Sequence, residues 1–182
     1  FLATKITFIN EIAGLCERVG GDVKEVARGI GLDGRIGNKF LHAGPGYGGS
    51  CFPKDTAALA RIGQEHAHPM QITETVIKVN EETKRRMIDK IMDLCGGSVN
   101  GRTIGVLGVT FKPNTDDMRE APSLTIIKAL RDAGASGAYL DTFADLDAAR
   151  ALYVRAGFRL VREWGGDTWG VRVREQRYEL DF

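Results

Sequence analysis

The sequence predicts a mainly α-helical N-terminal domain (residues 1–95), then a partial α/β domain (96–136) and a C-terminal helix with a β-hairpin (137–182). Three observations support this fold class. Apolar residues recur at helical spacing through most of the first domain, between glycine-rich breaks. A strand pattern and a helix open the second domain, but no further strand and helix units follow them. The last residues alternate as two short strands do.

Two helices are expected ahead of the first glycine-rich loop. Apolar residues repeat at helical spacing from residue 1 to about 19, and Gly20 follows as a helix stop. Asp22 is then placed to cap a second helix that runs to about Gly29. Because Phe1 already lies within the apolar pattern with no capping residue before it, we expect the first helix to continue from residues upstream of this sequence.

A glycine-rich loop, residues 44–53, interrupts the helical pattern. Pro53 has the position of a first helical residue, so a helix is expected from there to Gln64, with Cys51 beside its N-terminus. A longer helix is predicted for residues 73–94. Its apolar face is expected to carry Val76, Ile77, Val79, Met87, Ile88, Ile91 and Met92, with Glu81, Glu82, Lys84, Arg85 and Arg86 elsewhere.

The remaining elements begin after a glycine-rich stretch at residues 96–101, a plausible domain boundary. The expected elements are a buried strand at 103–109, helices at 123–132 and 146–155, and strands at 158–161 and 171–180. The last two strands are expected to form a hairpin around Gly165 and Gly166. Because one strand and one helix cannot form a sheet covered on both faces, the α/β domain is expected to be partial.

Composition and charge exclude several classes of function. Lys plus Arg number 25 against 24 Asp plus Glu, so no field of one sign favours nucleic acid or a membrane surface. No apolar run is long enough to cross a bilayer, and no signal peptide is recognisable. The 3 cysteines, widely spaced, favour a reducing cytoplasm over disulfides or zinc, and the scattered histidines predict no metal site.

Cys51, Lys54 and Asp55 form a compact candidate catalytic group. The positive end of the helix dipole and the ammonium of Lys54 would stabilise the Cys51 thiolate, and the Asp55 carboxylate could hold Lys54, orient a water or act as a base. The loop glycines would let backbone N–H groups approach a substrate. The competing interpretation is that Cys51 is a small buried apolar residue in a structural turn. Cys16 and Cys95 are interpreted as packing residues, because each is expected on the apolar face of a helix with no base or cation to activate it.

Residues 44–55, Gly-Pro-Gly-Tyr-Gly-Gly-Ser-Cys-Phe-Pro-Lys-Asp, closely resemble the active-site signature of the UDP-glucose/GDP-mannose dehydrogenase family, and Phe52 favours its UDP-glucose members. Other similar segments are 35–41 just before the signature, 1–17 on the family's central dimer helix, and 105–112 with 116–120 in its nucleotide-binding third domain. The resemblance implies a central dimerisation domain at 1–95 and a partial Rossmann-like, UDP-binding domain at 96–136.

The resemblance also implies an activity, the four-electron oxidation of a UDP-sugar C6 alcohol to the carboxylate with NAD as acceptor. Cys51 would carry a thiohemiacetal and then a thioester, while Asp55, beside Lys54, would assist proton transfer and hydrolysis. Arg119 would lie near the cofactor phosphates. The residues implied in UDP-sugar binding are Arg35, Phe40, Tyr47, Gly48 and Lys112, and Arg35 would reach the substrate of the partner subunit in a homodimer.

Two departures from the family qualify this activity. The family's NAD-binding domain and its catalytic Lys and Asn would lie upstream of Phe1, so we expect the 182-residue chain by itself to form no NADH. After Ala135 the family would continue with a strand and an Asp-Pro step, and the sequence of residues 139–146 does not resemble that continuation. A junction with another kind of protein is therefore expected near residue 136.

The tail from residue 137 resembles the C-terminal end of GNAT-type acetyltransferases, chiefly at residues 147–158 and 174–180. Tyr153 has the place of the tyrosine that protonates the coenzyme A thiolate in that family, but the pyrophosphate-binding loop is not recognisable. Two alternatives to the dehydrogenase interpretation stay open. The chain could act as a non-catalytic dimerisation module, or as an acyltransferase remnant.

Overall fold

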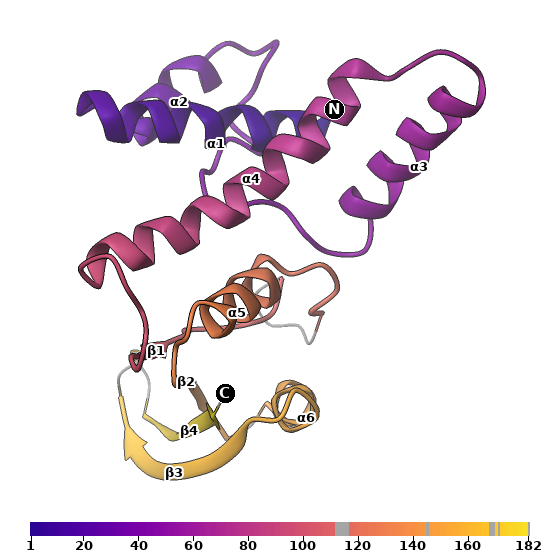
Figure 1. The fold of residues 1–182 in the computed structure, drawn as a ribbon. Helices are drawn as coiled ribbons and strands as arrows, with labels where there is room; N and C mark the ends of the chain where they lie inside the picture. Colours follow the sequence, from indigo (N-terminus) through magenta and orange to yellow (C-terminus); the bar gives the residue numbers. More distant parts are fainter. Residues whose placement is uncertain (112–116, 145, 168–169, 171, 182) are drawn as a thin grey trace. The chain divides into compact units, whose positions relative to one another are not determined.

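The computed structural model describes residues 1–111, 117–144, 146–167, 170 and 172–181. They form two compact units, Phe1–Met87 and Ile88–Phe182 (Figure 1). The helices of the first unit are α1 (Leu2–Val19), α2 (Val23–Gly31), α3 (Phe52–Glu65) and the larger part of α4 (Gln71–Leu94). All four agree with the predicted helices, and the carboxylate of Asp22 caps α2 by accepting the Lys24 N–H at 2.7 Å.

The middle of α4 differs from the sequence prediction, because its buried face there is polar. Asn80, Thr83 and Lys84 are each no more than 4% exposed. They follow Val76 at helical spacing, so they share one face of the helix. Lys84 was expected to lie off the buried face. Its ammonium reaches Glu81 at 2.7 Å while its aliphatic stem is covered, which allows a lysine to be buried there.

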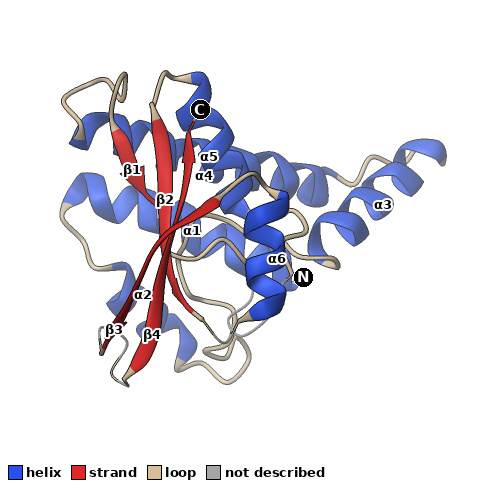
Figure 2. Cartoon of the chain, turned by 90° about the horizontal axis from the view of Figure 1, so that it is seen from below, coloured by secondary structure: helices blue, strands red, loops and turns tan. Residues whose placement is uncertain are grey.

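The second unit contains one mixed sheet of order β1-β2-β4-β3 (Figure 2). Its strands are β1 (Thr103–Gly105), β2 (Gly137–Phe143), β3 (Arg159–Gly166) and β4 (Val173–Asp181), and its helices are α5 (Pro122–Asp132) and α6 (Asp147–Arg155). β1 and β2 are parallel, and β4 is antiparallel to both β2 and β3. Helices with a small mixed sheet agree with a partial α/β fold, as predicted.

The strand predicted at residues 103–109 is shorter and more exposed than expected. The strand covers Thr103–Gly105 only, although the Val106 N–H still donates to the Tyr139 carbonyl at 2.7 Å, and Leu107 is 73% exposed. Gly108 has φ 74°, which turns the chain out of extended conformation. In the described sheet β1 is an edge strand, paired with β2 on one side, so it is not the interior strand that the prediction of a buried strand assumed.

Strand β2 was missed by the sequence analysis, and the turn of the hairpin was misplaced. Ala138, Leu140 and Thr142 are buried at alternate positions, which is the ordinary signature of a strand. β2 lies beyond residue 136 and yet pairs with β1, so one sheet joins the two sides of the expected junction. Gly165 and Gly166 are not the hairpin turn, because both are paired within β3.

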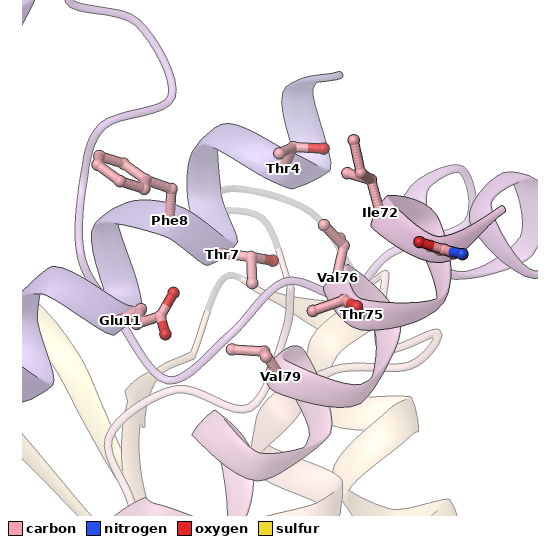
Figure 3. A pocket seen from close by; sticks show the side chains of 9 residues that line it. Thr4, Thr7, Phe8, Glu11, Ile72, Thr75, Val76 and Val79 are labelled. Atoms are coloured by element: carbon pink, nitrogen blue, oxygen red, sulfur yellow. The ribbon is translucent and has the colours of Figure 1, made fainter.

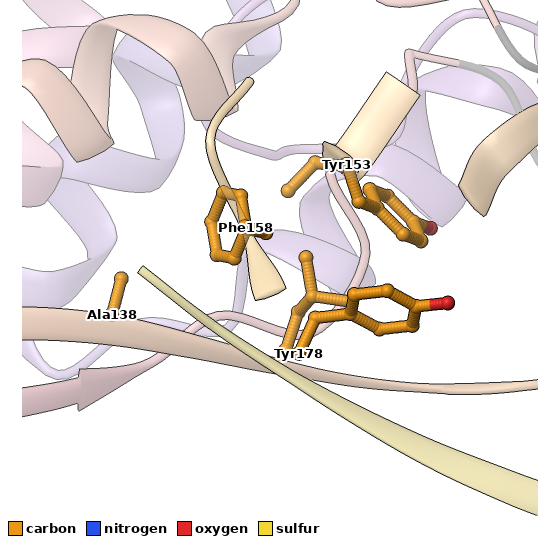
Figure 4. Packing of buried hydrophobic residues seen from close by; sticks show 6 residues of the cluster. Ala138, Tyr153, Phe158 and Tyr178 are labelled. Carbon is orange, nitrogen blue, oxygen red and sulfur yellow. The ribbon is translucent and has the colours of Figure 1, made fainter. Parts of the chain in front are cut away.

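The core of the second unit lies between the sheet and its two helices. Leu140 and Tyr178, both at most 1% exposed, pack with Ala138, Val109, Tyr153 and Phe158 (Figure 4). Ile127 of α5 and Tyr153 of α6 belong to this same cluster, so both helices cover one face of the sheet. The opposite face carries polar residues.

Candidate active site around Cys51

Cys51 is the N-cap residue of α3, directly before its first residue, Phe52. Its backbone lies at φ −96° and ψ −60°, and its carbonyl accepts the Asp55 N–H at 2.8 Å, closing the first helical turn. The thiol is free and exposed, with the Ser50 hydroxyl 3.6 Å from the sulfur. A thiol in this position lies close to the unpaired N–H groups at the positive end of a helix. The predicted placement of Cys51 beside a helix N-terminus is therefore confirmed.

Lys54 and Asp55 lie on the first turn of the same helix. The Lys54 ammonium is 3.4 Å from a carboxylate oxygen of Asp55, and both side chains are largely exposed. An exposed pair of this kind contributes little to stability. Asp55 also lines a cavity of about 300 Å³, together with Phe1, Leu2, Ala3, Thr4, Phe52, Thr56, Leu59, Thr73 and Val76. The carboxylate is thus open to a water or a small ligand.

Three aromatic rings pack under the loop. Phe52 meets Tyr47 edge-on with ring centroids 5.9 Å apart, and Phe40 with centroids 6.1 Å apart. Phe40 has φ 66°, an unusual conformation for a side chain of its size. Tyr47 is only 3% exposed, and burial raises its pKa, with a hydrogen bond to Thr56 opposing the shift. These ring contacts tie Phe40 and Tyr47 to Phe52, so they hold together the parts of the chain before and after the loop glycines.

Two buried asparagines, which the sequence analysis did not single out, hold the loop. Asn80 accepts the Tyr47 N–H at 2.7 Å and donates to the Tyr47 carbonyl at 3.1 Å. Asn10 of α1 accepts the Gly44 N–H at 2.7 Å. Gly46 has φ 111° and lies so close to Asn80 that a Cβ there would be 2.9 Å from the amide oxygen. The sequence indicates only that Asn80 follows Val76 by four residues and so shares the apolar face of the predicted helix; nothing in it indicates the contact with the loop.

Arg35, predicted to bind the UDP-sugar, lies in a loop of the first unit that is held by its own hydrogen bonds. The Arg35 guanidinium binds the carboxylate of Asp33, which raises the pKa of Arg35 and lowers that of Asp33. The Lys5 ammonium of α1 holds the same loop through the carbonyls of Ile36 at 2.8 Å and Gly37 at 3.2 Å. Arg35 is 90% exposed, so its side chain is open to a further partner.

Three predicted site residues remain, and of these Arg119 belongs to the second unit. Lys112 lies outside the described residues. The Arg119 guanidinium donates to both carboxylate oxygens of Asp117, at 2.9 Å each. Gly48, by contrast, lies in the loop of the first unit and is buried.

A groove of about 380 Å³ lies between α1 and the start of α4 (Figure 3). Phe8 and Ile72 line it, 46% and 74% exposed, and the hydroxyl of Thr7 has no hydrogen-bond partner among the described atoms. Within the described residues, no group of His, Cys, Asp and Glu is arranged to hold a metal ion. In the same part of the chain, none of the helices has the length and apolar character to cross a bilayer.

Two family models match the sequence. Residues 1–82 match the central domain of the UDP-glucose/GDP-mannose dehydrogenase family, and residues 105–168 match the UDP binding domain of the same family. The second match extends well past residue 136, where the sequence analysis placed a junction. Together the two matches include the Cys51 loop and strand β2.

Individual relatives agree with the family models. UDP-glucose 6-dehydrogenase of Rhizobium meliloti is 63% identical over 135 residues, 74% of this chain and 31% of that protein. The corresponding TuaD enzyme of Bacillus subtilis is 54% identical over 152 residues, 84% of this chain and 33% of that protein. A UDP-glucose dehydrogenase structure from Pyrobaculum islandicum matches with TM-score 0.77 and 42% identity, covering 84% of this chain and 35% of that one. The chain thus spans about a third of the length of these relatives.

Proposed function

Because this chain belongs to the UDP-glucose/GDP-mannose dehydrogenase family, we propose that it provides the nucleophile loop and part of the UDP-binding domain of a UDP-glucose 6-dehydrogenase. The observation that carries the proposal is the free, exposed thiol of Cys51 at the start of α3. A thiol in such a position can act as a covalent nucleophile toward a carbonyl carbon. The relatives named above bear the same activity in their names.

In the proposed reaction the C6 alcohol would first be oxidised to an aldehyde, to which the Cys51 sulfur would add as a thiohemiacetal. A second oxidation, with NAD again the hydride acceptor in the whole protein, would give a thioester. A water then attacks the thioester carbonyl, and the carboxylate is released as the sulfur leaves. Asp55 is placed four residues along the same helix and would take a proton from that water, with Lys54 beside it. We propose Arg35, Phe40, Gly48 and Lys112 as contacts of the UDP-sugar, and Tyr47 as a more buried contact.

NAD would accept the hydrides of both oxidations in the whole protein. Of the described residues, only Arg119 was predicted to lie near its phosphates, and its Nε and one terminal nitrogen donate to the carboxylate of Asp117. The roles proposed above therefore concern the covalent steps at Cys51 and the contacts of the UDP-sugar. We expect the 182-residue chain to produce no NADH from UDP-glucose and NAD, and NADH formation at a measurable rate would contradict this.

We also propose a homodimer through α1 in a cytoplasmic protein. Leu15 and Val19 of α1 are 57% and 70% exposed, as is suited to a helix that packs on a second copy. The three-part division at residues 95 and 136 remains our proposal. For the tail, an acetyltransferase remnant is the weaker alternative, because the UDP-binding match reaches residue 168.

Calorimetric titration of the purified chain with UDP-glucose, NAD and acetyl-CoA tests the proposal. We expect heat of binding from UDP-glucose and none from acetyl-CoA. Cys51→Ser is the matched control, because it removes the nucleophile and keeps the loop. It should bind UDP-glucose but lose alkylation by iodoacetamide at residue 51. Heat from acetyl-CoA alone would favour the acyltransferase remnant, and no heat from any ligand would favour a dimerisation module.

A further inference from the structure

We infer that Asn80 is a positioning residue for the Cys51 loop, supported by Asn10 at the start of that loop. The inference rests on the proposed function only in taking Cys51 as the reacting group. Asn80 does not need to touch the substrate. It acts through the backbone of Tyr47, four residues before the nucleophile, and through that backbone it sets where the loop lies on α4.

Asn80 binds the backbone N–H and C=O of Tyr47 as a residue of a neighbouring antiparallel strand would. Its amide oxygen accepts from the Tyr47 N–H and its amide nitrogen donates to the Tyr47 carbonyl, at 2.7 and 3.1 Å. Two opposed hydrogen bonds to one residue fix both the position and the orientation of its backbone. Because Gly46 has no Cβ, the backbone can approach the amide this closely. An apolar residue at position 80 would leave both polar groups of Tyr47 unpaired.

Asn80 is itself held rigidly, which a positioning residue requires. It is 3% exposed and lies on α4 between Val76 and Lys84, both also buried. The Lys84 stem lies against the same glycine, Gly46, at 3.3 Å from the position of a Cβ. The polar stripe of α4 is therefore the surface on which the loop rests.

Asn10 joins this arrangement to α1. Its side-chain oxygen accepts the Gly44 N–H at 2.7 Å, and its backbone carbonyl accepts from the Arg86 guanidinium of α4 at 3.0 Å. The loop is thus held by α1 at Gly44 and by α4 at Tyr47, and it ends at Cys51 on α3. The sulfur is placed relative to three helices, although the loop that carries it has no regular structure.

Hydrogen exchange of the 182-residue chain tests the inference, with residue resolution from fragmentation or NMR. In the unsubstituted chain the Tyr47 amide should exchange at a rate near that of the α4 amides, although it lies in a loop. Asn80→Ala should raise the Tyr47 exchange rate about tenfold or more, since a buried hydrogen bond is lost, while amides of α1 and α3 keep theirs. Thr83→Val is the control, because the Thr83 hydroxyl binds only the Val79 carbonyl of its own helix among the described contacts.

A second readout separates positioning from mere stabilisation of the fold. Iodoacetamide labelling of Cys51 is followed by peptide mass spectrometry at increasing UDP-glucose. UDP-glucose should protect Cys51 in the unsubstituted chain and in Thr83→Val, and protection should need at least about tenfold more ligand in Asn80→Ala. The inference would be overturned if UDP-glucose protected Cys51 equally in the unsubstituted chain, Thr83→Val and Asn80→Ala. It would also be overturned if the Tyr47 amide of the unsubstituted chain exchanged as fast as an unprotected loop amide. Absence of protection in the unsubstituted chain would overturn the proposed function, and the exchange rates would still decide the role of Asn80.

Discussion

Substitution of Gly46 by alanine tests how closely the nucleophile loop approaches α4. The residue has φ 111°, a conformation that costs an L-residue about 1–2 kcal/mol. The new Cβ would also lie 2.9 Å from the amide oxygen of Asn80, closer than carbon and oxygen pack. Asn80 cannot swing away without losing its bonds to Tyr47, and overpacking of this kind costs about 1–3 kcal/mol. We expect Gly46→Ala to lower the free energy of unfolding by about 2–5 kcal/mol.

Two other glycines separate the two contributions. Gly20 has φ 73° but no atom within 4 Å of a Cβ, so Gly20→Ala should show the backbone contribution alone, about 1–2 kcal/mol. Gly44 has neither a positive φ nor a neighbour within 4 Å, so Gly44→Ala should change the stability little. The three variants should therefore rank Gly46, Gly20, Gly44 in loss of stability.

Urea unfolding followed by far-UV circular dichroism measures this ranking in the helical first unit. Tryptophan fluorescence serves as an internal control, because both tryptophans, Trp164 and Trp169, belong to the second unit, whose transition should not shift. A Gly46→Ala variant no less stable than Gly20→Ala would refute the reasoning, since it would mean that the loop can move off Asn80 at no cost.

Three further predictions concern other parts of the chain. Burial raises the pKa of Tyr47 above 10.0, so the contribution of the neutral phenol to the stability of the first unit should be fully present below about pH 10 and be lost as pH rises through the raised pKa; Tyr47→Phe should remove this part of the alkaline loss in dichroism. Leu15→Glu should convert the proposed dimer to monomer in sedimentation velocity at micromolar concentration, whereas Leu32→Glu, equally a change of an exposed leucine, should not, and a monomeric unsubstituted chain would rule the proposed dimer out. Asp141→Asn weakens the two 2.7 Å bonds to Arg177 and should destabilise the second unit by about 1–3 kcal/mol, measured by urea unfolding with tryptophan fluorescence; an unchanged midpoint would contradict it.

The helices of the first unit could be predicted because each carries a long periodic signal. The apolar repeat of α1, the cap at Asp22 and the proline after Cys51 each indicate a boundary without reference to the rest of the fold. The start of α3 follows from the loop residues alone, and with it the placement of the candidate nucleophile. Local rules suffice where a helix and its ends are set by neighbouring residues.

The contacts around the site could not be predicted in the same way. Asn10 and Asn80 lie 34 and 33 residues from the loop positions that they bind, so no local pattern links them. A polar residue on a helix is ordinarily assigned to solvent, and only the tertiary partner makes Asn80 a buried residue. Strand β2, by contrast, had a local signal in its alternating residues. It was missed because the segment was compared with a family pattern rather than with strand periodicity.

The antiparallel pairing of β4 with β2 limits how this sheet could be enlarged. β4 is hydrogen-bonded along β2 from Gly137 to Phe143, and β1 occupies the other side of β2 from Gly137 to Tyr139. A designer wishing to insert another parallel strand beside β2 would first have to displace the hairpin. New strands could be added only outside β1, which offers three residues, or outside β3, whose register is broken between Leu160 and Arg162. Short and irregular edges of this kind also give little template for pairing with a second sheet.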